Sequence, residues 1–250
     1  MAIKLINDEC ISLMEKMKEN SVDMVFCDLP YGTTQNNWDV IIPFEKLWSC
    51  YNNIVKENGA IILTASQPFT SLLISSNIKN FKFEWIWKKT IGSGQLNIKR
   101  QPLKQHENIL VFYRKPPCYN EQKTKGEPYK ITRKNGTLKK SNYGEQKEHS
   151  KENEGYRHAQ SIIEIPNPRK KGGHPTEKPV SLCEYFIKTY SNEGDVVLDN
   201  CMGSGSTGVA CINLNRNFIG IEMDKDYFDK AKERLERVEK EKTKIQDLFE

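Results

Sequence analysis

The chain has 250 residues, of which 37% are hydrophobic and 28% charged, a composition typical of ordinary globular proteins. It contains no uninterrupted apolar run near the roughly 20 residues that a membrane helix needs, and no charged-then-apolar leader, so we expect a cytoplasmic protein without a membrane partner. The seven cysteines form no CxxC pair and the four histidines have no ligand spacing, which argues against a metal site and against a disulfide framework.

The first 114 residues alternate apolar, strand-like runs with amphipathic stretches. The expected strands lie at 3–6, 22–27 and 60–65, and the expected helices at 10–18, at 44–56 and from residue 68. Two β-rich runs follow at 81–88 and 108–113, and a glycine-containing loop joins them. We expect this pair to form an antiparallel hairpin on a sheet edge.

Periodicity is lost between residue 115 and about residue 165. From Arg114 to Lys171 the chain has 15 Lys+Arg and 7 Asp+Glu, a net charge of +8 in 58 residues, whereas the whole chain carries only +5. A structureless loop of this length is unusual inside a compact domain unless it has a function, so we interpret residues 115–171 as an inserted module. Its charge suits a polyanion such as nucleic acid, although a solvated, lysine-rich surface would have the same composition.

Strand–helix alternation returns after the insert. Helices are expected at 180–190 and 206–214 and from residue 226, and strands at 196–199 and 218–222. Alternation on both sides of the insert predicts an α/β fold, with a mostly parallel sheet and helices on both faces. Residues 1–114 and 172–250 are then two halves of one domain.

The first strong motif is the segment VVLDNCMGSGSTGVACINLNRNFIGIEMD near the C-terminus. A strand ends at Asp199, a glycine turn follows at Gly203–Gly205, and a helix begins directly afterwards. Glycines let the backbone approach a ligand, and the helix N-terminus offers free N–H groups. Glu222 ends the next strand, 19 residues after Gly203, at the spacing where a carboxylate accepts hydrogen bonds from ribose hydroxyls. This motif alone does not separate a nicotinamide dinucleotide from S-adenosylmethionine (SAM).

The second motif, DLPY, follows the apolar run VDMVFC near the N-terminus. The carboxylate of Asp28 and the backbone carbonyl of Leu29 can accept hydrogen bonds from the two N–H groups of an exocyclic amine, and so make its nitrogen a better nucleophile. Pro30 restricts the backbone of residue 29 and thereby holds that carbonyl in one direction. Tyr31 offers a flat face on which an extruded base can stack. A nicotinamide dehydrogenase would have no use for this motif.

These motifs, with HPTEKP at the end of the insert, resemble the beta class of DNA amino-methyltransferases, in which the catalytic motif comes first, a target-recognition insert follows and the cofactor motif comes last. The resemblance covers nearly the whole chain and implies a Rossmann-like class I methyltransferase fold with SAM as cofactor. The cofactor-binding residues that it implies are Asp8, His174, Thr176, Lys178, Asp199, Met202, Gly203, Ser204, Gly205, Thr207 and Glu222.

The resemblance also implies individual roles. Thr176 and Lys178 would lie near the methionine carboxylate of the cofactor, and Asp199 near its amino group. Glu222 would lie near the ribose and Asp8 near the adenine. The chain departs from the usual pattern at two places, because Leu29 replaces a proline and Asn200-Cys201 replaces a Pro-Phe pair.

The implied activity is methylation of the adenine N6 amino group in double-stranded DNA after base flipping. Cytosine-N4 enzymes belong to the same class but more often have Ser in place of Asp28, so the sequence favours adenine; a catalytically silent DNA-binding relic is the other alternative. The recognition sequence, a homodimer and a restriction endonuclease partner stay open. The candidate DNA-binding residues are Lys99, Arg100, Arg133, Lys134, Lys139 and Lys140.

Overall fold

The structure is a computed structural model that describes residues 1–33, 39–133, 149–167 and 177–248. These residues form two compact units, one made of Met1–Asn120 with Ser161–Glu250 and the other of Glu121–Gln160. The smaller unit falls within the basic segment that was predicted to be an insert. Within the described ranges, no helix combines the length and the apolar character that crossing a membrane requires.

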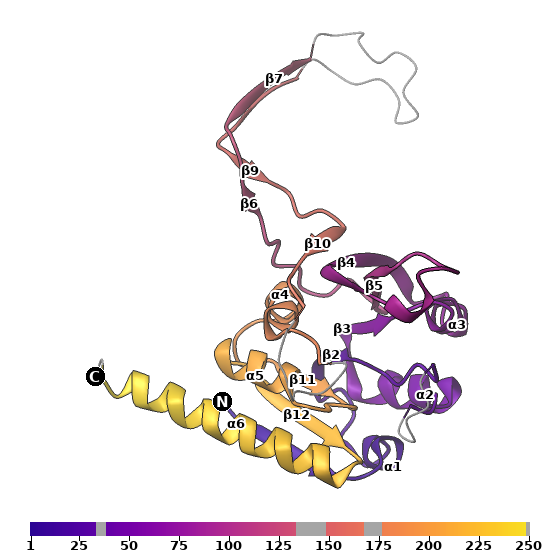
Figure 1. Ribbon diagram of the computed structural model, residues 1–250. Coiled ribbons are helices and arrows are strands. Elements are labelled where there is room, and N and C mark those ends of the chain that lie inside the picture. The colour runs from indigo at the N-terminus through magenta and orange to yellow at the C-terminus, as the bar shows by residue number, and fades with distance from the viewer. Residues whose placement is uncertain (34–38, 134–148, 168–176, 249–250) are drawn as a thin grey trace. The chain divides into compact units, whose positions relative to one another are not determined.

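An eight-stranded sheet, in the order β1-β12-β11-β2-β3-β5-β4-β10, forms the centre of the larger unit (Figure 1). The five strands from β1 to β3 are parallel, and β5 runs antiparallel to both β3 and β4. The strands are β1 Ile3–Asn7, β2 Val22–Cys27, β3 Val55–Ala65, β4 Phe81–Ser93, β5 Lys104–Phe112, β10 Ile162–Glu164, β11 Val196–Asp199 and β12 Asn217–Glu222. The predicted mostly parallel sheet with an antiparallel hairpin is confirmed.

One strand of this sheet was not predicted. The short strand β10 pairs in parallel with β4, Ile162 opposite Ile86, and so lies outside the hairpin at the sheet edge. Three residues are too few to show an alternating pattern, which is why they could not be told apart from the insert in the sequence.

Helices cover both faces of the sheet, as predicted. The helices are α1 Cys10–Met14, α2 Phe44–Ile54, α3 Phe69–Ser76, α4 Val180–Tyr190, α5 Ser206–Asn213 and α6 Lys225–Gln246. Helices α1 to α3 share one core with Val25 and Cys27 of β2. Because side chains alternate along a strand, Phe26 points to the other face, where its ring stacks on Phe186 of α4 at a centroid distance of 5.9 Å.

Side-chain caps fix the starts of two of these helices. Glu9 precedes α1 and accepts hydrogen bonds from the backbone N–H groups of Ile11 and Ser12, both at 2.8 Å. Asp224 precedes α6 and accepts in the same way from Asp226 and Tyr227. A cap satisfies N–H groups that have no partner inside the helix. Helix α1 is shorter than predicted and ends at Met14.

The smaller unit is built from two antiparallel strand pairs, β6 Thr124–Lys125 with β9 Tyr156–Arg157, and β7 Tyr129–Arg133 with β8 His149–Asn153. The guanidinium of Arg157 lies 4.6 Å from the ring centroid of Tyr129. Such short strands give no recognisable period in the sequence, and the unit was therefore predicted only as an irregular module.

Candidate active site

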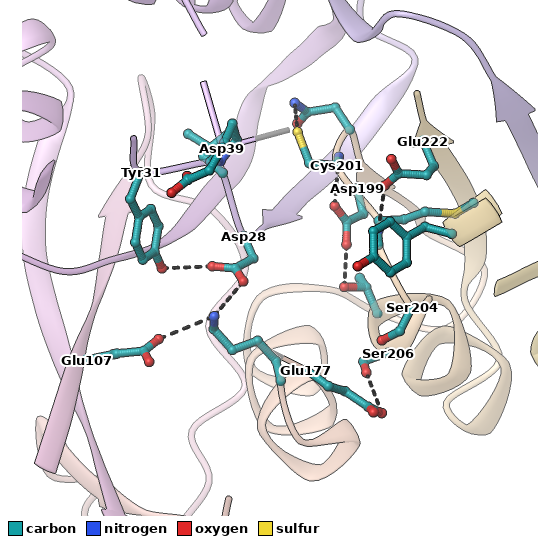
Figure 2. A pocket seen from close by; sticks show the side chains of 18 of the residues that line it. Asp28, Tyr31, Asp39, Glu107, Glu177, Asp199, Cys201, Ser204, Ser206 and Glu222 are labelled. Carbon is teal, nitrogen blue, oxygen red and sulfur yellow. Dashed lines mark hydrogen bonds and ion pairs between the residues drawn. The ribbon is translucent and has the colours of Figure 1, made fainter. Parts of the chain in front are cut away.

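Four acidic residues end neighbouring parallel strands of the sheet. Asp8 follows β1, Glu222 ends β12, Asp199 ends β11 and Asp28 follows β2, and these four strands are consecutive in the sheet. Because the carboxyl ends of parallel strands meet at one edge, the four side chains line a single cavity of about 670 Å³. Figure 2 shows Asp28, Asp199 and Glu222 in this cavity.

The glycine turn after β11 leaves one side of the cavity open. Gly203 has a φ of 49°, and a Cβ built there would meet no atom within 4 Å. Gly205, with a φ of 78°, faces the opposite way, where a Cβ would come within 2.6 Å of Leu235 in α6. One glycine therefore leaves room for a ligand, and the other lets α6 pack against the turn. Ser204 and Met202 also line the cavity.

Two carboxylates hold this turn. Glu222 accepts hydrogen bonds from the backbone N–H groups of Gly203 and Asp224, each at 2.9 Å, and burial raises the pKa of its carboxyl. Asp199 is 3% exposed and accepts from the Thr207 hydroxyl at 2.6 Å and from the backbone N–H of Cys201 at 3.1 Å. Burial raises the pKa of Asp199 to about 6, because the loss of hydration outweighs these hydrogen bonds.

The carboxylate of Asp28 is the centre of a second cluster. Its Oδ1 accepts a hydrogen bond from the Tyr31 hydroxyl at 2.7 Å and another from the Thr64 hydroxyl. Its Oδ2 lies 2.5 Å from the ammonium nitrogen of Lys178, which comes from the segment before α4. Lys178 was predicted to lie near the cofactor's methionine carboxylate; it lines the cavity, and the structure pairs it with Asp28.

A buried acid that sequence reasoning missed completes this cluster. Glu107 of β5 pairs with Lys89 of β4 and lies 3.3 Å from Lys178. Burial alone would lower the pKa of Lys178, but the carboxylates of Asp28 and Glu107 outweigh it and the net pKa is raised. Burial would raise the pKa of Glu107, and the two ammonium groups lower it. The cluster therefore holds two carboxylates and two ammonium groups at the cavity wall. Figure 2 shows Asp28 and Glu107 on either side of one of these ammonium groups.

The two residues that follow the DLPY motif are held by Asp39, which also lines the cavity. Asp39 accepts hydrogen bonds from the backbone N–H groups of Gly32 at 2.8 Å and of Thr33 at 2.9 Å. The side chain of Leu29 is 3% exposed and belongs to the core of α1 to α3. The ring of Tyr31 stacks on Phe69 at a centroid distance of 5.0 Å, so one of its faces is covered while the residue lines the cavity.

The unusual Asn200-Cys201 pair has a local explanation. The side chain of Asn200 is buried and accepts a 2.6 Å hydrogen bond from the hydroxyl of Tyr51 in α2. Both residues of the pair line the cavity. The polar contact is thus made by the residue that replaces the proline of the family pattern, and Cys201 stands where that pattern has phenylalanine.

The remaining predicted residues fall into three groups. Asp8 and Pro30 line the cavity, and Asp8 accepts a hydrogen bond from the backbone N–H of Glu9 at 2.8 Å. Lys99 and Arg100 are exposed in the loop between β4 and β5. The others lie outside the described residues, apart from the backbone of Arg133; they are His174, Thr176, Lys134, Lys139 and Lys140.

A parallel sheet with acidic strand ends and a glycine turn is the framework of class I methyltransferases. The model of the family described as DNA methylase, which covers N6 and N4 enzymes, matches residues 22–233. The type II methyltransferase M.HpaI of Haemophilus parainfluenzae is 30% identical over 249 residues, which cover 93% of this chain and 74% of that protein. The chain belongs to the N6/N4 family of DNA methylases.

Two further proteins are similar to the chain over nearly its whole length. The DNA adenine methyltransferase YhdJ of Escherichia coli K12 is 26% identical over 253 residues, covering 93% of this chain and 82% of that protein. The crystal structure of the M1.HpyAVI–SAM complex matches with a TM-score of 0.63 and 28% identity, covering 93% of this chain and 100% of that one. The predicted family and fold are therefore confirmed.

Proposed function

We propose that this chain methylates the N6 amino group of adenine in double-stranded DNA, with Asp28, Leu29, Pro30 and Tyr31 as the catalytic motif. The observation that carries the proposal is the position of Asp28. Its carboxylate is held at the wall of the same cavity that the glycine turn lines. Membership of the DNA methylase family supplies the reaction class.

The residues around the glycine turn fit S-adenosylmethionine, the cofactor of this family. The open space over Gly203 accommodates a ligand against the backbone, and a cavity of about 670 Å³ is within the usual range for small-molecule sites. Glu222 would accept from ribose hydroxyls, Asp199 from a cationic amino group, and Asp8 would lie at the adenine. When bound, the cofactor supplies a methyl group already activated by its sulfonium centre.

The chain's own residues then polarise and orient the acceptor. Asp28 accepts a hydrogen bond from the target amino group and draws electron density towards its nitrogen, while the carbonyl of Leu29 accepts the second. Lys178 and the Tyr31 hydroxyl hold the Asp28 carboxylate in place before the base arrives. Because the cluster pairs two acids with two ammonium groups, it adds little net charge beside a cationic cofactor.

Adenine is favoured over cytosine by Asp28, because the family resemblance implies that cytosine-N4 enzymes more often have serine at this position. The relative YhdJ carries the name of an adenine methyltransferase. The direct test is expression in a methylation-free host, followed by long-read sequencing of the host DNA. We expect N6-methyladenine within one short sequence; N4-methylcytosine instead would reassign the target, and an unmodified genome would mean a catalytically silent protein.

Cofactor binding should weaken in acid because of Asp199. Its carboxyl has a pKa of about 6, and only the ionised form accepts from an ammonium group. Below this pH the carboxyl must lose a proton on binding, so Kd should rise by up to about tenfold for each pH unit. Calorimetric titration of S-adenosylmethionine from pH 5 to pH 8 measures this slope.

The variant Asp199→Asn should bind more weakly but without that slope, because an amide does not titrate. Glu222→Gln is the matched comparison, since the pKa of Glu222 is also raised. If the pH dependence of Kd disappears in Glu222→Gln and persists in Asp199→Asn, Glu222 is the group that titrates. That result would contradict the role given to Asp199.

The smaller unit is proposed to contact DNA phosphates. Lys123, Lys125 and Lys151 are exposed there. Replacing these three lysines by glutamine should weaken DNA binding and reduce the slope of log K against log salt by about one for each phosphate that the unit no longer binds. Fluorescence anisotropy between about 50 and 200 mM salt measures the slope. Lys240→Gln on α6 is the control, and equal slopes in all proteins would make the unit's lysines merely solvated surface.

A further inference from the structure

The loop between β4 and β5 exposes apolar side chains beside the cavity. Leu96 is 101% exposed, more than any other large apolar residue in the part of the chain that the structure describes. In the same loop, Ile98 is 61% exposed and Leu103 is 46% exposed. Isolated exposed apolar residues are common, but here three of them lie within eight residues of one loop.

This loop forms part of the cavity rim. Gly92, Ser93 and Gln95 line the cavity, and Gln95 immediately precedes Leu96. Asp28 lines the same cavity. The exposed apolar residues of the loop therefore follow directly after residues that line the cavity of the catalytic motif.

Hydrogen bonds within the loop hold its backbone in a defined shape. Gly94 has a φ of 93° and starts a single helical turn, Gln95–Asn97. The side-chain amide of Gln95 donates to the carbonyl of Gly92 at 2.7 Å, and the N–H of Asn97 donates to the carbonyl of Gly94 at 2.9 Å. Leu96 is therefore exposed on a turn whose backbone is held by hydrogen bonds.

The positive charge of the loop indicates an anionic partner. Between Ser93 and His106 the chain has Lys99, Arg100 and Lys104 and no acidic residue. Cationic side chains beside a projecting leucine are complementary to a partner that has anionic groups on its surface and an apolar layer beneath them. Duplex DNA has this arrangement, with phosphates flanking the base stack.

We infer that Leu96 is a wedge that enters the DNA base stack beside the target base, while Lys99 and Arg100 bind the flanking phosphates. The inference rests on the proposed function, because a target base must leave the duplex before its amino group can reach Asp28. Unstacking and unpairing a base is energetically unfavourable, and an apolar side chain that fills the vacated position offsets part of this cost.

The test compares two DNA duplexes that carry the methylated sequence identified by mapping. One is fully paired, and the other has an abasic site opposite the target base, so that the base is already unpaired. The single-turnover rate of methyl transfer is measured for the wild type, Leu96→Ala and Leu96→Phe. Ile78→Ala is the control, because Ile78 is 66% exposed and does not line the cavity.

We expect Leu96→Ala to lose about tenfold or more on the paired duplex and about twofold or less on the abasic one, because the second substrate needs little unpairing. Leu96→Phe and Ile78→Ala should stay near the wild type on both. An equal loss on both duplexes, or no loss on either, would overturn the wedge. Provided that the wild type methylates the paired duplex, such a result leaves the proposed function intact. Failure of the proposed function would be seen earlier, as an unmodified genome or as N4-methylcytosine in the mapping experiment.

Discussion

Asp28→Ala is expected to lower the rate of methyl transfer by on the order of a hundredfold to a thousandfold while leaving cofactor binding largely unchanged. Removing a preorganised hydrogen-bond partner from a reacting atom typically has an effect of this size. The carboxylate of Asp28 contacts Tyr31, Thr64 and Lys178 rather than the glycine turn, so its loss should act on the base and spare the cofactor.

The measurement is transfer of labelled methyl groups to DNA, carried out beside calorimetric titration of S-adenosylmethionine. Asp23→Ala is a matched control, because Asp23 is an acid of β2, the strand that Asp28 follows, and it pairs with Lys56 at 2.6 Å without lining the cavity. That variant should lose stability and keep its turnover. Near-normal turnover in Asp28→Ala would contradict the amino-methylation mechanism, whatever the target base.

The sequence was sufficient for the fold because the relevant signals are local. Apolar runs of strand length and the glycine turn each occupy a few neighbouring residues, and the alternation of strand-like with helix-like runs predicts a parallel sheet. The row formed by Asp8, Glu222, Asp199 and Asp28 also follows from this pattern, since each acid ends or directly follows a strand. The fold was predicted correctly for this reason, and the family and cofactor class because the motifs and their order resemble those of the beta-class enzymes.

The partners of these acids could not be predicted because they come from distant parts of the chain. Lys178 is 150 residues from Asp28, and Thr64 is 36 residues away. Glu107 stands one residue before the run that was predicted as a strand, and nothing in its surroundings marks it as buried. Spacing along a chain carries no information about such contacts, which depend on the order of strands and on the packing of α4 against the sheet.

Lys178→Met is the second change for which we expect a large effect. Lys178 has a side chain only 10% exposed, and it pairs with Asp28 and Glu107. Its removal leaves two acids in one cluster with Lys89 as their remaining cation, and breaking a buried pair in this way costs about 3 kcal/mol or more of unfolding free energy. The Asp28 carboxylate also loses the contact that orients it, so methyl transfer should fall by on the order of a hundredfold.

The same variant separates two roles for this lysine. If Lys178 acts through Asp28, turnover at saturating S-adenosylmethionine falls and the cofactor Kd changes by less than about threefold, well under the roughly tenfold that about 1.4 kcal/mol would give. Lys178→Arg, which keeps the charge, should recover part of the rate and of the stability. If the cofactor Kd rises by tenfold or more instead and turnover at saturation is normal, the lysine serves the methionine carboxylate, as the family resemblance implies. The ion pair with Asp28 would then have no part in positioning the catalytic carboxylate.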